Sequence, residues 1–65
     1  MALTLRQWRR VKEISQERMA ELLKIHVNTY QNWEKEPEKI SIANAVKIAD
    51  ILGVGMNEIS FKSEE

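Results

Sequence analysis

The segment 27–35 carries polar side chains spaced so that they share one side of a helix. At about 100° per residue, one face of such a helix gathers Asn28, Gln31, Asn32 and Lys35. Tyr30 and Trp33 fall on the opposite side and suit a core. Amides match the donor and acceptor edges of bases in a DNA major groove. The spacing therefore indicates either a DNA-reading helix or the ordinary solvent face of an amphipathic helix.

Length and composition limit what else the chain can hold. Its 65 residues allow one small domain with a single core, 1–65. There is no cysteine, which excludes disulfides and cysteine-based zinc sites, and the one histidine, His26, has no partner at metal-ligand spacing. We expect no metal, no cofactor and no small-molecule ligand. With no apolar run of about 18 residues and a polar N-terminus, we expect a cytoplasmic protein that does not enter membranes.

Charge is balanced overall but uneven along the chain. Ten Lys and Arg residues offset ten Asp and Glu residues. The first twelve residues carry +4, leaving −4 on the rest, because they hold no acid and four bases: Arg6, Arg9, Arg10 and Lys12. Nucleic-acid binders usually show a basic surplus, so a DNA-binding function requires one positive face. The same basic cluster is also compatible with a plain solvated helix surface.

Capping signals place the first two helices. Thr4 and Gln7 form a capping-box pattern that starts a helix over 5–12. Ser15 is a favourable N-cap for a helix over 16–23. The second helix should bury Met19, Ala20 and Leu23.

Three further helices complete the expected architecture. The polar segment 27–35 ends before Pro37, which pushes the preceding residue out of the helical region. Ser41 caps a helix over 42–52, and Gly53 ends it. The apolar stripe of this helix comprises Ile42, Ala45, Ile48, Ala49 and Leu52. A last helical turn is expected over 56–60, followed by a frayed tail, 62–65. No strand alternation is visible, which predicts an all-α fold of five short helices.

Over about residues 4–60 the sequence resembles helix-turn-helix domains of the phage repressor and Cro type, the XRE family. The matching residues are Arg9, 15–20 (Ser-Gln-Glu-Arg-Met-Ala), the turn 24–26, Tyr30, Trp33, Glu34 and 49–54. The resemblance implies a compact five-helix, lambda-repressor-like fold. It also implies that 16–23 crosses the phosphate backbone and 27–35 enters the major groove.

Site residues follow from this resemblance. Base reading is expected from Asn28, Asn32 and Val27. Contacts to the DNA backbone are expected from Gln16, Thr29, Gln31, Lys35, Arg10 and Arg6. Arg9 and Glu34 are expected to form a structural ion pair. Ile59 and Phe61 are the candidate dimer contact. Trp8 and Trp33 are expected in the core rather than stacked on bases.

Three residues depart from the family pattern. Glu13 and Lys24 stand where glycine is common, and His26 replaces the usual small hydroxyl cap. A non-glycine residue in a left-handed conformation costs roughly 1 kcal/mol, so the turn before 27–35 is expected to be either less favourable or shaped differently.

These observations favour a sequence-specific DNA-binding transcriptional regulator, a small phage or mobile-element repressor or Cro-like protein. It would bind a pseudo-palindromic operator in double-stranded DNA as a homodimer. Two forms of this hypothesis are open: the dimer exists in solution, or it forms only on DNA. The alternative is a helical protein-interaction module, an antitoxin or adaptor, which the neutral charge favours. No nucleophile, phosphate loop or cleft-forming length accompanies the carboxylates, so there are no catalytic residues and an enzyme is not expected.

Overall fold

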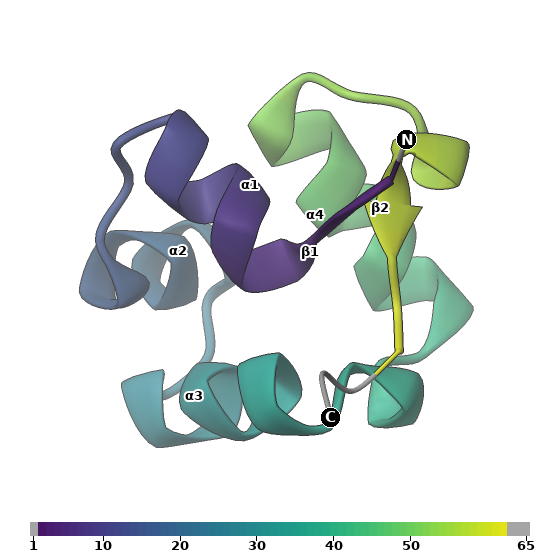
Figure 1. The fold of residues 1–65 in the computed structure, drawn as a ribbon. Helices are drawn as coiled ribbons and strands as arrows, with labels where there is room; N and C mark the ends of the chain where they lie inside the picture. Colours follow the sequence, from purple (N-terminus) through teal and green to yellow (C-terminus); the bar gives the residue numbers. More distant parts are fainter. Residues whose placement is uncertain (1, 63–65) are drawn as a thin grey trace.

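The computed structural model describes residues 2–62. Within these residues the chain forms four α-helices, two 3₁₀ turns and two short strands (Figure 1). The helices are α1 (Leu5–Val11), α2 (Gln16–Leu23), α3 (Val27–Lys35) and α4 (Ile42–Leu52). The last three cover the residues expected from the sequence. Helix α1 is one residue shorter than expected, since Lys12 serves as its C-cap.

Local hydrogen bonds fix where the helices begin. The capping box is present, with Gln7 N donating to Thr4 Oγ1 at 3.2 Å and Thr4 N donating to Gln7 Oε1 at 2.9 Å. The Ser15 hydroxyl accepts from the backbone of Arg18, and the Ser41 hydroxyl caps α4 in the same way. These bonds satisfy N–H groups that have no partner within their own helix.

The segment after α4 differs from the expectation. The helical turn expected over 56–60 is present only over Met56–Glu58, and the expected absence of strands was wrong. Residues Met56–Glu58 form the 3₁₀ turn η2, and Ile59–Ser60 form strand β2, which pairs in parallel with β1 (Leu3–Thr4). The extended form allows Ile59 to reach the core while its backbone pairs with Leu3. If the helical turn continued over 59–60, Ile59 would neither reach the core nor pair its backbone with Leu3.

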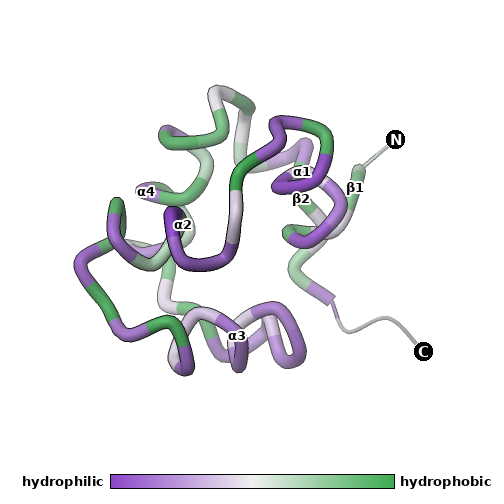
Figure 2. Tube along the Cα trace, turned by 90° about the vertical axis from the view of Figure 1, so that its left-hand side faces the viewer, coloured by the Kyte–Doolittle hydropathy of each residue, from purple (hydrophilic) through white to green (hydrophobic). Residues whose placement is uncertain are grey.

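The core lies where α1, α2 and α4 meet the inner side of α3. Its buried residues are Leu5, Met19, Ala20, Leu23, Tyr30, Ala45, Ile48, Ala49, Leu52 and Ile59. Helix α4 is the most hydrophobic helix along its trace, whereas α3 is mostly hydrophilic (Figure 2). Ile42 was expected in the core, but it is 80% exposed. It is the first residue of α4, beyond the edge of the buried stripe.

Two further features stabilise the fold: a buried proline after α3 and a hydrogen bond between α1 and the segment before β2. Pro37 is buried in the 3₁₀ turn η1 (Pro37–Lys39), which follows α3. The indole nitrogen of Trp8, on α1, donates to the carbonyl oxygen of Glu58 at 2.7 Å. This bond joins the same two segments of the chain that the strands β1 and β2 bring side by side (Figure 1). Trp8 and Trp33 are both half-buried and pack against the core.

Candidate nucleic-acid interface

A tight turn joins α2 to α3. Lys24 has φ 59° and ψ 45°, the left-handed conformation that favours glycine. The next residue, Ile25, donates its N–H to the carbonyl of Ala20 at 3.0 Å, which closes α2. His26 is the N-cap residue of α3, but its side chain makes no capping hydrogen bond. The turn therefore keeps the left-handed geometry with a lysine in place of glycine.

An ion pair fastens α3 to α1. Arg9 Nε lies 2.6 Å from Glu34 Oε2, and the two side chains are only 12% and 5% exposed. Arg9 also donates to the carbonyl oxygen of Ile14 at 2.9 Å, in the loop between α1 and α2. The pair expected from the family resemblance is thus present, and it ties three segments together. Its burial makes it costly to break, because either partner alone would be a buried charge.

Electrostatics keep this cluster in one protonation state. Burial would raise the pKa of Glu34, but hydrogen bonds from Arg9 and Gln16 and the nearby Tyr30 hydroxyl outweigh it, so the pKa falls below its ordinary 4.5. Burial, and after it the Glu34 carboxylate, raises the pKa of Tyr30. The Tyr30 hydroxyl is fully buried and forms no hydrogen bond within the described residues. At neutral pH, Glu34 is therefore a carboxylate and Tyr30 a neutral phenol.

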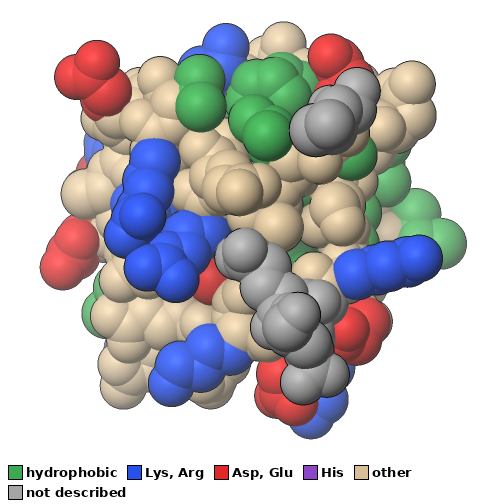
Figure 3. Space-filling model, in the orientation of Figure 1, with side chains coloured by type: hydrophobic (Ala, Val, Ile, Leu, Met, Phe, Trp, Pro, Cys, Tyr) green, Lys and Arg blue, Asp and Glu red, His purple; other side chains and the backbone are tan. Residues whose placement is uncertain are grey.

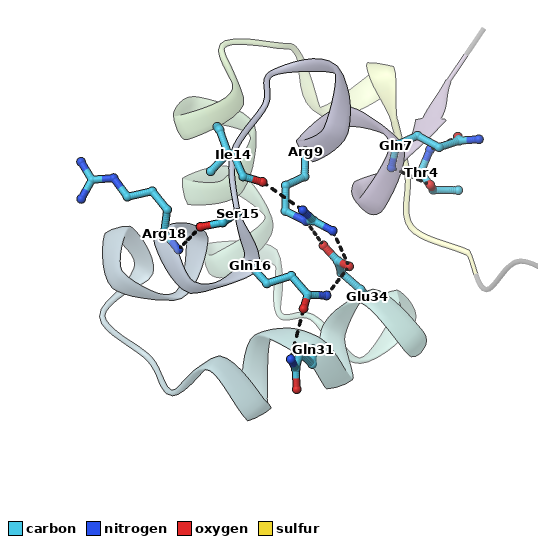
Figure 4. Close-up of polar contacts among 9 residues, drawn as sticks. All are labelled: Thr4, Gln7, Arg9, Ile14, Ser15, Gln16, Arg18, Gln31 and Glu34. Atoms are coloured by element: carbon cyan, nitrogen blue, oxygen red, sulfur yellow. Dashed lines mark hydrogen bonds and ion pairs between the residues drawn. The ribbon is translucent and has the colours of Figure 1, made fainter.

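Two glutamines extend the ion pair to the outer side of α3 (Figure 4). Gln16 Nε2, at the start of α2, donates to Glu34 Oε1 at 2.9 Å. Gln31 Nε2, on α3, donates in turn to Gln16 Oε1 at 3.1 Å. The family resemblance placed both glutamines at the DNA backbone and also suggested that Gln16 steadies a reading side chain, but it did not indicate which side chain Gln16 contacts. The spacing on one helix could not reveal it, because the bonds run between helices.

An open cleft of about 670 Å³ lies between α1 and α3. Its walls include three cations, Arg6 and Arg10 from α1 and Lys35 from α3, in addition to the residues of the hydrogen-bonded chain. Arg9 and Glu34 neutralise each other, so the other cations give the cleft a positive charge. Lys and Arg side chains gather on this side, where α1 faces α3 (Figure 3). Such a surface attracts phosphates despite the neutral total charge.

The expected reading residues lie on the outer side of α3. Asn28, Thr29 and Asn32 are exposed, and Asn28 and Asn32 are one helical turn apart. Val27 is half-buried and packs against the core, so only part of its side chain is free for a partner. The structure thus brings the asparagines together beside the basic cleft and draws Val27 partly inward.

The residues expected at a dimer contact lie differently. Ile59 was expected to contact a second subunit, but it is 5% exposed and belongs to the core. Its side chain is therefore not available for a dimer contact. Phe61 packs against the core and is half-buried. The reason is the pairing of β2 with β1, which turns Ile59 inward.

Two kinds of feature were not found in residues 2–62. This part of the chain has no group of three or more His, Cys, Asp or Glu residues that could hold a metal ion. Nor does it have a helix with the length and apolar character needed to span a bilayer.

Fold and site together define a helix-turn-helix domain, in which α3 presents amides beside a basic cleft. The helix-turn-helix family model HTH_3 matches residues 5–59. The chain therefore belongs to this family, the XRE type of helix-turn-helix, which is a family of DNA-binding regulatory domains. This confirms the resemblance found in the sequence. No curated protein and no solved structure matches the chain.

Proposed function

We propose that this protein is a repressor or Cro-like regulator of a phage or mobile element that reads a pseudo-palindromic operator as a homodimer. The observation that carries the proposal is a recognition helix that exposes Asn28 and Asn32 while Glu34 holds the same helix to α1 through Arg9. An asparagine can bond N6 and N7 of adenine at once. A reading helix fixed to its scaffold loses little conformational entropy on binding.

The surrounding residues divide the work of binding. Arg6, Arg10 and Lys35 supply charge to the sugar-phosphate backbone, and Gln16 and Thr29 supply neutral donors. Such contacts set the register and orientation of the helix on the duplex, whereas contacts to base edges carry the sequence information. Two copies whose half-sites lie about one helical turn apart would place both α3 helices in successive major grooves. Occupying the operator would then block polymerase or a competing regulator.

Selection from a random duplex library tests this proposal. The wild-type protein should enrich a two-fold motif, and Asn28→Ala should lose or relax the preference at one base pair in each half-site, since a good bidentate contact is worth about 1–3 kcal/mol. Asn57→Ala, an exposed asparagine in η2, serves as the control and should leave the motif unchanged. An Asn28→Ala variant that enriches the unaltered motif would contradict the assignment of Asn28.

Salt dependence separates this function from that of a protein-interaction module, which the balanced total charge favours. Logarithmic affinity for DNA should fall with logarithmic salt concentration by about 0.9 per phosphate neutralised. Arg10→Ala should reduce that slope by about one such unit, while Lys47→Ala, on α4, should not. Weak DNA binding with no slope, together with salt-insensitive capture of a protein partner, would favour the module.

A further inference from the structure

The side-chain amide of Gln31 has one end bonded inside the protein, and its other end has no hydrogen-bond partner among residues 2–62. Its nitrogen donates to Gln16 Oε1 at 3.1 Å. An amide nitrogen carries two hydrogens and the carbonyl oxygen carries none. The carbonyl oxygen and one remaining N–H of Gln31 are therefore available to an outside partner.

This orientation originates at Glu34. A carboxylate can only accept hydrogen bonds, and the one at Glu34 already accepts from Arg9 at 2.6 Å. Gln16 must therefore turn its amino group toward Glu34, and it does so at 2.9 Å. Its carbonyl oxygen is then left to face α3, where the only matching group of Gln31 is its amino end. The negative charge of Glu34 therefore sets the direction of both hydrogen bonds, from Gln16 to Glu34 and from Gln31 to Gln16.

A phosphate matches only half of the free end of Gln31. Phosphate oxygens accept hydrogen bonds, so a phosphate could use the remaining N–H of Gln31 but not its carbonyl oxygen, which is also an acceptor. The cations that suit phosphates, Arg6, Arg10 and Lys35, line the same cleft. Adenine in the major groove presents a donor, the N6 amino group, beside an acceptor, N7. That pattern complements a carbonyl oxygen beside one N–H.

We propose that Gln31 reads an adenine in each half-site, with Oε1 accepting from N6 and Nε2 donating to N7, and that Gln16 is the positioning residue that fixes this polarity. The proposal rests on the DNA-reading function above and replaces the backbone contact expected for Gln31. Gln31 is half-buried on α3, one turn after Asn28, so the two amides would address neighbouring base pairs from the same side of the helix.

The first test compares the motif selected by Gln31→Ala with that of the wild type. The variant should lose an adenine preference of about tenfold or more at one base pair per half-site and keep the rest of the motif. A uniform loss of affinity with the motif unchanged would show a phosphate contact and overturn the proposal. Selection of guanine at that position by the wild type would also overturn it, because guanine offers acceptors only.

Base analogues at the same position sharpen this result. Purine without its 6-amino group, and 7-deazaadenine, should each weaken binding of the wild type by several-fold relative to adenine. Neither analogue should change the affinity of Gln31→Ala. Equal losses in the wild type and the variant would contradict the contact.

The second test addresses Gln16. Gln16→Met keeps the length of the side chain but removes both hydrogen bonds, while the Arg9–Glu34 pair remains. The variant should relax the preference at the same base pair as Gln31→Ala, and a double variant should add nothing there. A lower melting temperature with an intact preference would show a merely structural role. Should Gln16→Met fail to fold, Gln31→Ala and the analogues still decide whether Gln31 reads adenine.

The two proposals fail in different ways. If the wild type enriches no motif at any salt concentration, the DNA-reading function itself is wrong, and this inference falls with it. If the wild type enriches a motif that Gln31→Ala leaves intact, only this inference is wrong.

Discussion

Glu34 illustrates how one residue can carry two duties. It lies on the recognition helix, pairs with Arg9 from α1 and accepts from Gln16 at the start of α2. The carboxylate thus holds α3 in place and also orders the side chains that face outward. Asn28, by contrast, is exposed and has no part in the core. Stability and recognition therefore depend on different residues of the same helix.

Glu34→Gln should lower the free energy of unfolding by about 3 kcal/mol at pH 7, because it leaves the Arg9 charge buried without a counter-ion. The comparison is by thermal or urea melting. Glu21→Gln, in the exposed pair with Arg18, and Asn28→Ala are the controls and should melt close to the wild type. Equal melting points for Glu34→Gln and Asn28→Ala would show that the Arg9–Glu34 ion pair does not stabilise the fold.

The stability difference between the wild type and Glu34→Gln should depend on pH. The pKa of Glu34 is lowered in the folded state from 4.5, so its stabilisation is fully present above that value and is lost as the pH falls through the folded-state pKa. The difference in stability between wild type and Glu34→Gln should therefore be constant from pH 7 to about 5 and shrink in more acidic solution. A difference that stays constant down to pH 3 would be inconsistent with a lowered pKa.

At the scale of the elements, the loops on either side of α2 contain backbone strain. Lys24 and Glu13 adopt φ values of 59° and 57°, and both stand at the loops that frame α2. A side chain in this conformation costs roughly 1–2 kcal/mol, partly offset by the lower entropy of the unfolded chain relative to glycine. The turn keeps its shape because α2 and α3 pack tightly against each other and the core.

Lys24→Gly should raise the free energy of unfolding by up to about 1 kcal/mol, because it relieves the left-handed strain. Lys47→Gly, at an exposed position inside α4, is the matched control and should lower stability by about 1 kcal/mol. Urea denaturation of both variants gives the comparison. A loss of stability at Lys24 similar to that at Lys47 would mean that the strain is negligible.

At the scale of the whole molecule, the domain closes on itself. Strands β1 and β2 bring residues 3–4 and 59–60 together, and the indole nitrogen of Trp8 donates to the carbonyl oxygen of Glu58 close to this pairing. This closure buries Ile59 and removes the most apolar candidate from the proposed dimer contact. Less apolar area is then left near the C-terminal segment to hold two subunits together.

We expect the free protein to sediment as a 7.6 kDa monomer at micromolar concentration and two copies to assemble on an intact palindrome. Phe61→Ala should reduce affinity for the full palindrome more than for a half-site, because Phe61 is the half-exposed aromatic residue next to β2. Sedimentation with and without duplex measures both effects. A stable dimer or tetramer without DNA would contradict this expectation.

Features with a local cause were visible in the sequence. Thr4, Ser15 and Ser41 cap helices through bonds that span three residues, and Gly53 ends α4 in a left-handed conformation. The family and the presence of the Arg9–Glu34 pair also followed from the motif. Short-range patterns of this kind are set by the neighbouring residues and depend little on the rest of the fold.

Features with a distant cause were not visible. The segment 56–60 was expected to be helical, yet it contains a strand, because its partner lies at the other end of the chain. The link from Glu34 through Gln16 to Gln31 joins two helices, and no spacing within either helix encodes it. The sequence thus settles the helices, their caps and the family. Packing alone settles what Ile59 contacts and which atoms Gln31 presents, since backbone pairing and side-chain polarity both depend on groups brought close only by folding.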